Sequence, residues 1–136
     1  MKTFLGALVD TPKGFGLTNE RTGAVVAWDL ATAFDSESRR TGLLRHTALG
    51  EGTALIIAPS NAVHTFFMRF PIDLAFVTRD GRIVKVKGSV GPWRLAAAIR
   101  AFAVIELAAG RLERTETVRG DRLIVTRTQP DEVRLA

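Results

Sequence analysis

The chain has 136 residues, of which 46% are hydrophobic and 24% are charged; this is the balance of one globular domain and excludes a disordered or fibrous protein. It contains no cysteine, so disulfides, thiolate catalysis and cysteine-based metal or iron–sulfur centres are excluded. The formal net charge of +5 comes mostly from scattered arginines, which indicate a basic surface more strongly than a dedicated site for a polyanion.

The N-terminal part is expected to be irregular, because Pro12 and Gly16 break any regular period within residues 1–22. The apolar run from Phe4 to Val9 is too short to cross a bilayer and is marginal as a secretion signal. We therefore expect a cytoplasmic protein that has no membrane partner.

Two strands and a helix are predicted next. Ala24 to Ala31 alternates like a strand that is buried on both sides, and Thr53 to Ala58 has the composition of a second buried strand. Between them, Asp35 is suited to cap a helix, with Leu43 and Leu44 as core contacts.

The most apolar and aromatic stretch of the chain runs from His64 to Asp73 and carries polar groups at intervals. Alternation from His64 to Phe70 predicts a strand, which Pro71 interrupts because proline cannot donate to an interior ladder. The chain is expected to bend there and to resume as a strand over residues 72–78.

Asp80 and Gly81 then predict a hairpin, because both central residues of a two-residue type I′ turn need positive φ. In that hairpin Ala75 faces Val86, which places Asp73 on the side that holds the core. A carboxylate in that place needs polar partners.

The C-terminal half continues as short elements. We expect a Gly/Pro loop over Ser89–Trp93, an irregular connection or a turn of helix over residues 94–100, a strand over Ala101–Leu107, a short helix from about Arg111, and a last strand over Arg122–Arg127. The sequence thus predicts one domain over residues 1–136, mostly β, with a core at about 24–127 and a loose arm and tail.

Several of these pieces resemble the DUF192 family of bacteria and archaea, a family of unknown function. They are, in order, Arg40-Thr41-Gly42-Leu43-Leu44-Arg45, the stretch from His64 to Asp73, Phe76-Val77, Asp80-Gly81, Glu106-Leu107, Gly110 and Gly120-Asp121. The resemblance implies an α+β fold with a curved, barrel-like sheet and one or two short helices, and it implies no known activity. Many relatives carry a secretion signal and a tryptophan at the position of Phe67, so the chain resembles the cytoplasmic branch.

The candidate ligand-binding residues are His64, Thr65, Arg69, Asp73 and Glu106. His64 opens the central stretch after a loop, where an imidazole serves as a general base or ligand group, or bonds a backbone carbonyl. Arg69 and Asp73 flank the bend and are suited to a bidentate ion pair. Our leading hypothesis is a non-catalytic binding or accessory domain with a cleft for a small polar or anionic ligand near these residues.

One alternative is a hydrolase-like enzyme that uses His64 with Asp73 or Glu106. If the two carboxyl groups lay across one cleft, they would suit acid–base catalysis. The pattern supports no metal site, because only His46 and His64 are available and no metal-binding spacing is present, and it predicts no cofactor.

A second alternative is weak binding of nucleic acid through a basic hairpin. Its candidate residues are Arg79, Arg82, Lys85 and Lys87, with Phe76 near enough to stack on a base. Lysines on an edge strand also prevent sheets from associating, so a protective role is equally consistent with this pattern.

Overall fold

The computed structural model describes residues 2–41 and 48–128, which form three sheets, two short α-helices and one 3-10 helix. The central sheet has five strands, in the order β3 (Asp29–Ala33), β4 (Thr53–Ile57), β9 (Ala103–Ala108), β6 (Ile72–Val77) and β7 (Ile83–Val90). The small sheet consists of β10 (Leu123–Arg127), β1 (Phe15–Asn19) and β2 (Val25–Ala27). The ribbon pairs β5 (Ala62–His64) with β8 (Leu95–Ala97), and the helices are η1 (Gly6–Leu8, 3-10), α1 (Ser36–Thr41) and α2 (Arg111–Arg114).

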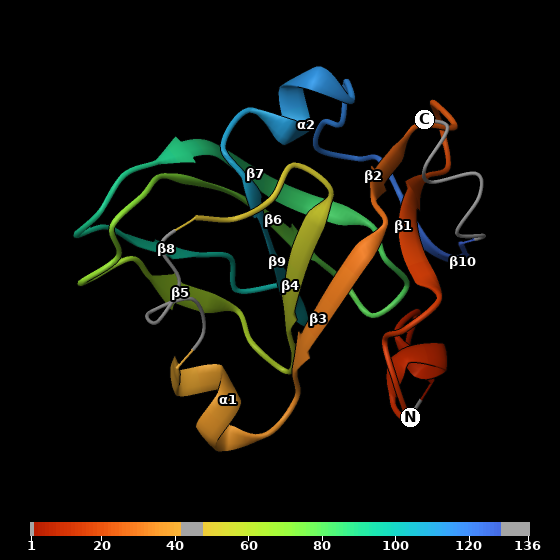
Figure 1. Ribbon diagram of the computed structural model, residues 1–136, viewed down its shortest axis with the longest axis horizontal. Helices are drawn as coiled ribbons and strands as arrows, with labels where there is room; N and C mark the ends of the chain where they lie inside the picture. The colour runs from red at the N-terminus through yellow and green to blue at the C-terminus, as the bar shows by residue number, and fades with distance from the viewer. Residues whose placement is uncertain (1, 42–47, 129–136) are drawn as a thin grey trace.

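The predicted α+β class with a mostly β content is confirmed, while the sheets stay open rather than closing into one barrel. Figure 1 shows the small sheet on one side of the central sheet and the ribbon on the other. Neither α1 nor α2 has the length or the apolar character needed to cross a bilayer.

Two apolar cores lie on opposite faces of the central sheet, because its inner strands are buried on both sides. Leu17, Ala75 and Leu107 belong to the core shared with the small sheet. Leu74 and Met68 belong to the second core, against which Val63 and Ala96 of the ribbon pack. Alternate residues of β6 and β9 therefore point into different environments, and this decides where each polar residue lies.

The N-terminal arm and the first predicted strand differ from expectation. Residues expected to be irregular form η1 and β1, and Leu5 and Leu8 are buried in the first core. The predicted strand over residues 24–31 is two strands, β2 and β3, in different sheets. The alternation of apolar residues does not show whether such a run forms one strand or two consecutive strands in different sheets.

The helix cap and the hairpin also test local rules. The Asp35 carboxylate accepts a bond of 2.7 Å from the Ser38 N–H at the start of α1, as a cap should. Leu43, Leu44, Arg45, His46 and the tail beyond residue 128 lie outside the described residues. In the turn of the hairpin, Gly81 has positive φ and Asp80 does not, so the turn is a bulged form rather than type I′, and Val77 pairs with Ile83.

Candidate functional site

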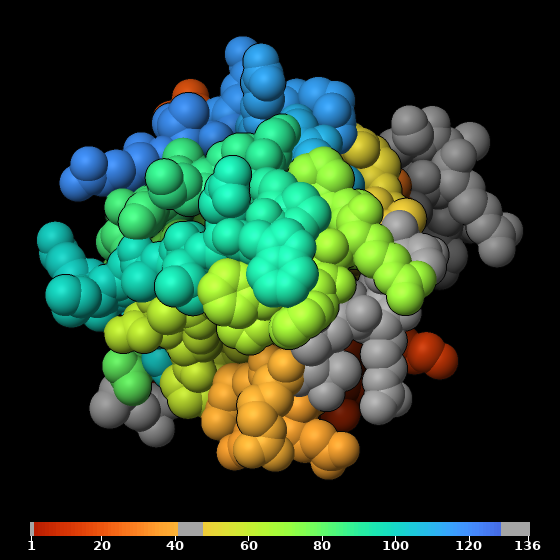
Figure 2. All heavy atoms as spheres, turned by 90° about the vertical axis from the view of Figure 1, so that its left-hand side faces the viewer, coloured from red at the N-terminus to blue at the C-terminus, as the bar shows by residue number. Residues whose placement is uncertain are grey.

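An exposed aromatic cluster lies where the loop after β5 meets the loop before β8. Its members are His64, Phe66, Phe67, Trp93 and Leu95, which we call the aromatic face. Ring centroids lie 5.7 Å apart for Phe66 and Trp93, 4.7 Å for Phe67 and Trp93, and 5.0 Å for His64 and Phe66. The two loops project on the same side of the molecule in Figure 1, and this side faces the viewer in Figure 2.

The pairing of the ribbon explains why this side is exposed. His64 lies opposite Leu95 and Val63 lies opposite Ala96. Directly opposite residues point to the same side, so Val63 and Ala96 face the second core while His64 and Leu95 face solvent. Large apolar side chains are thus placed outward by the same register that anchors the ribbon.

The backbone of this face adopts conformations that bulky residues rarely accept. Phe67 has φ 68° and Trp93 has φ 63°, and their side chains are 68% and 58% exposed. The Met68 N–H donates to the Thr65 carbonyl, so Phe67 occupies the turn position where glycine or asparagine is usual. Such strain costs roughly 1–3 kcal/mol per residue and persists only where the surroundings fix it.

Thr65 is the residue that fixes both loops. Its hydroxyl donates to the Gly91 carbonyl at 2.6 Å and accepts from the Arg94 N–H at 2.9 Å. Its carbonyl accepts from the Trp93 N–H at 3.1 Å. Thr65 is 1% exposed, so in this structure it positions the aromatic face and leaves its polar atoms little access to a ligand.

Asp73 is buried, and its partners are backbone groups rather than Arg69. One carboxylate oxygen accepts from the Ser89 and Gly110 N–H groups at 2.8 and 3.0 Å, and the other accepts from Leu112 N–H at 2.9 Å. The carboxylate therefore ties β6 to the end of β7 and to α2, and it lies on the core side that the sequence predicted. The predicted Arg69–Asp73 ion pair is wrong, and exposed Arg69 pairs with no carboxylate among the described residues.

Glu106 lies on the other face of the central sheet. It stands opposite Leu55 of β4 and Leu74 of β6, whereas Asp73 stands opposite Leu107. The two carboxyl groups therefore point to opposite faces, and the hypothesis that they work across one cleft is wrong. Glu106 is 3% exposed, no described residue bonds its carboxyl group, and burial raises its pKa to about 7.

His64 stays at the surface, where its ring packs on Phe66 and its Nδ1 accepts from the Phe66 N–H at 3.3 Å. No described carboxylate bonds to it, so the arrangement does not resemble a base oriented by an acid. His64 and Arg69 are thus the two predicted ligand residues that the structure leaves accessible.

The basic hairpin is mostly engaged within the chain. The Arg79 guanidinium lies 4.5 Å from the Phe102 ring centroid, Arg82 donates to the Gly120 carbonyl, and the Lys85 amine donates to the Ala97 carbonyl. Phe76 pairs with Lys85 as predicted but is wholly buried, so the expectation that it stacks on a base is wrong. Lys87 remains exposed.

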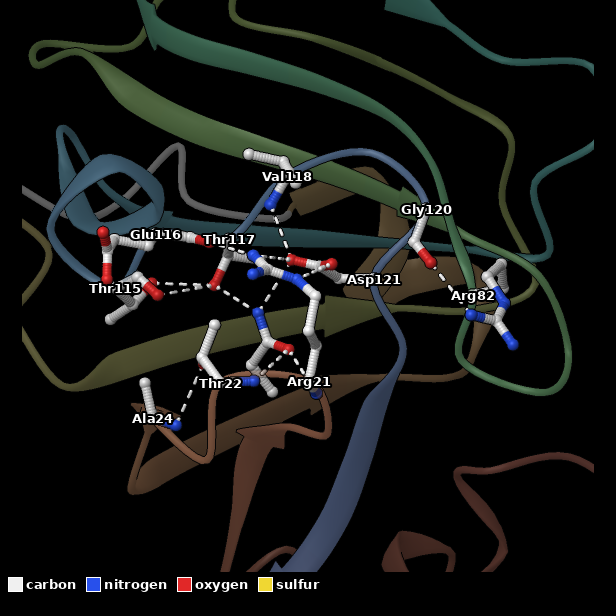
Figure 3. A network of polar contacts seen from close by, with 11 residues as sticks. Arg21, Thr22, Ala24, Arg82, Thr115, Glu116, Thr117, Val118, Gly120 and Asp121 are labelled. Carbon is white, nitrogen blue, oxygen red and sulfur yellow. Dashed lines mark hydrogen bonds and ion pairs between the residues drawn. The ribbon is translucent and has the colours of Figure 1, made fainter.

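A separate polar network closes the far end of the molecule (Figure 3). Asp121 is buried and accepts from the Arg21 guanidinium, the Asn19 amide and the Val118 N–H. The Arg21 hydrogen bond is the main reason why the pKa of Asp121 lies far below its usual value. Both oxygens of this carboxylate accept hydrogen bonds that join the end of β1 to the turn before β10, so the role of Asp121 is structural.

No three histidine or acidic side chains gather closely enough to hold a metal ion in the part of the chain that the structure describes. The residues of the aromatic face that sequence reasoning missed are Phe66, Phe67, Trp93 and Leu95. Phe67 was expected within a strand and Trp93 within a loop, without a role for either. The available signal was a tryptophan beside Gly91 and Pro92, where loop geometry tends to expose a large ring.

Comparison with known proteins identifies the fold. The model of the DUF192 family, described as "Uncharacterized ACR", matches residues 17–125. A crystal structure of a "putative transcription regulator" from Sinorhizobium meliloti has a TM-score of 0.70 and 20% identity, covering 80% of this chain and 89% of that one. A protein of unknown function from Novosphingobium aromaticivorans has a TM-score of 0.67 and 24% identity, covering 80% and 81%. No curated protein matches the sequence.

Proposed function

Because the chain belongs to the DUF192 family, which brings no established activity, we propose a function from its site: a non-catalytic binding domain that holds an anionic ligand on the aromatic face. The observation that carries this proposal is the pair Phe67 and Trp93. Both are large rings kept at the surface in positive φ, where relaxation or burial would be more favourable for the fold alone.

The charge around this face supports an anion as the ligand. Arg69 and Arg94 are exposed beside the rings, and residues 59–72 contain no aspartate or glutamate. The ligand would also need a flat or apolar part, since rings offer dispersion and stacking rather than hydrogen bonds. The arrangement of His64 favours binding over catalysis, because its neighbours are rings and a backbone N–H.

A thermal-shift screen tests the proposal with nucleotides, sugar phosphates and citrate as probes. A compound that binds only the folded state adds about 2.7 kcal/mol of stability at a hundredfold excess over its Kd. Arg69→Glu should abolish the shift. Arg119→Glu is the matched control, because Arg119 is exposed, forms no ion pair among the described residues, and gives the same change in net charge.

The proposal predicts that wild type and Arg119→Glu respond alike, and that Arg69→Glu does not respond. An equal response in all three proteins would place the ligand elsewhere and contradict it. So would the absence of a shift with every anionic probe.

A further inference from the structure

We propose that the ligand of the aromatic face is a single-stranded nucleic acid, whose bases stack on the rings and whose phosphates pair with the surrounding arginines and lysines. This inference rests on the proposed binding function and names the class of ligand. It differs from the basic-hairpin hypothesis, since it places the strand on the outward side of the ribbon.

The aromatic face continues along the outward side of the ribbon. Beyond the rings, this side carries the paired residues Ala62 and Ala97, which are small and exposed. Ile99, almost fully exposed, follows. We call the rings, the outward residues of β5 and β8, and Ile99 together the strip.

The sequence around this strip is basic and carries no acidic residue. Residues 59–72 and 81–105 contain no aspartate or glutamate, although they carry several arginines and lysines. Arg69, Lys87 and Arg100 are exposed and form no ion pair with any described residue, and the Arg94 guanidinium donates only to the Trp93 carbonyl. Cations that lack carboxylate partners, within the strip and close to it in the sequence, suit a chain of phosphates.

The mixture of rings and charges on the strip favours a single strand over a duplex or a lipid surface. Stacking on aromatic side chains needs a free π-face, which only an unpaired base provides, so a single strand fits better than a duplex. His64 and Arg94 interrupt the apolar side chains in the middle of the strip. Their burial in hydrocarbon would be costly, which disfavours a lipid surface as the occupant.

Fluorescence anisotropy of labelled oligonucleotides tests this inference on the full chain. The probes are oligouridine and oligothymidine of about 12 nucleotides and a duplex of the same length. We expect both single strands to bind at low salt and the duplex to bind at least about tenfold more weakly, with affinity falling steeply as salt is added. RNA and DNA arms distinguish the natural source of the strand.

The variants separate this site from general basicity. Phe67→Ala with Trp93→Ala should weaken single-strand binding by about tenfold or more, as lost stacking does. Arg69→Glu should also weaken it, whereas Arg119→Glu and Val118→Ala should bind like wild type, because they alter exposed residues away from the strip. Circular dichroism confirms that each variant is folded.

Equal binding of the duplex and the single strands, or equal losses in Arg69→Glu and Arg119→Glu, would overturn the inference. Binding to phosphatidylserine vesicles without binding to oligonucleotides would overturn it in favour of a lipid surface. If small anions stabilise the protein through Arg69 while oligonucleotides do not bind, the nucleic-acid inference fails and the binding function stands.

Discussion

Two buried carboxyl groups lie at adjacent register positions on neighbouring strands and point to opposite faces of the sheet. Their surroundings, and therefore their chemistry, differ for this reason. Asp73 points toward the first core and meets three backbone N–H groups, whereas Glu106 points toward the second core and meets no described donor. Hydrogen bonds stabilise a buried carboxylate, and their absence favours the neutral acid. A buried carboxyl group thus stabilises the fold at Asp73 and destabilises its own charged form at Glu106.

Glu106 should make stability depend on pH. Its pKa rises from 4.5 to about 7 in the folded protein, so the folded state keeps a proton that the unfolded state has lost. The contribution of Glu106 to the free energy of unfolding should therefore be largest below pH 4.5 and fall by roughly 3 kcal/mol as the pH rises through 7. Urea denaturation across this range should show the fall in wild type and not in Glu106→Gln; an equal fall in both would assign it to other groups.

Asp73→Ala should be strongly destabilising, because it leaves three N–H groups without their acceptor. We expect the free energy of unfolding to drop by about 3 kcal/mol or more. Asp35→Ala removes the exposed cap of α1 and serves as the control, with an expected loss of about 1 kcal/mol. Similar losses in the two variants, measured by urea denaturation, would contradict the anchoring role of Asp73.

At the scale of elements, the two loops that carry the aromatic face hold Phe67 and Trp93 exposed in backbone conformations that cost stability. Thr65 ties them together through its hydroxyl and its backbone. The Ser89 N–H, which donates a hydrogen bond to the Asp73 carboxylate, lies at the end of β7, just before the loop with Trp93. Thr65 and Asp73, two residues predicted to bind a ligand, thus hold the loops of the aromatic face in place.

Phe67→Gly should separate stability from binding. Glycine accepts positive φ at no steric cost, so the free energy of unfolding should stay unchanged or rise by up to about 1 kcal/mol. Phe70→Gly is the control, because Phe70 packs partly buried on the second core and its loss should cost about 2–4 kcal/mol. Thermal denaturation would contradict the strain argument if Phe67→Gly lost as much stability as Phe70→Gly.

The sequence predicted elements well where a local rule and burial agreed. The Asp35 cap, β4, β6, β9 and the helix at Arg111 are close to their predicted bounds. The prediction failed where tertiary contacts determine the backbone. A strand was predicted from His64 to Phe70, but β5 ends at His64, because Thr65 bonds to the loop that carries Trp93 and the backbone turns there. Exposure of Phe67 follows from that turn, and hydrophobic periodicity cannot predict it.

Across the whole molecule, the cations have two distinct environments. Arg21, Arg111, Arg114 and Arg122 pair with carboxylates in the half that contains the small sheet and α2. The strip on the ribbon has cations without such partners among the described residues.

A ligand that binds against Trp93 should change the emission of this residue, and tryptophan fluorescence measures this directly because the chain has only one other tryptophan, Trp28. Trp28 lies between β2 and β3, with the Arg111 guanidinium 5.2 Å from its ring centroid, so Trp93→Phe leaves a reporter that is not part of the aromatic face. Titration with oligouridine and, separately, with ADP should quench wild type and leave Trp93→Phe unchanged. Quenching that persists in Trp93→Phe, or no change in wild type with either probe, would contradict the account.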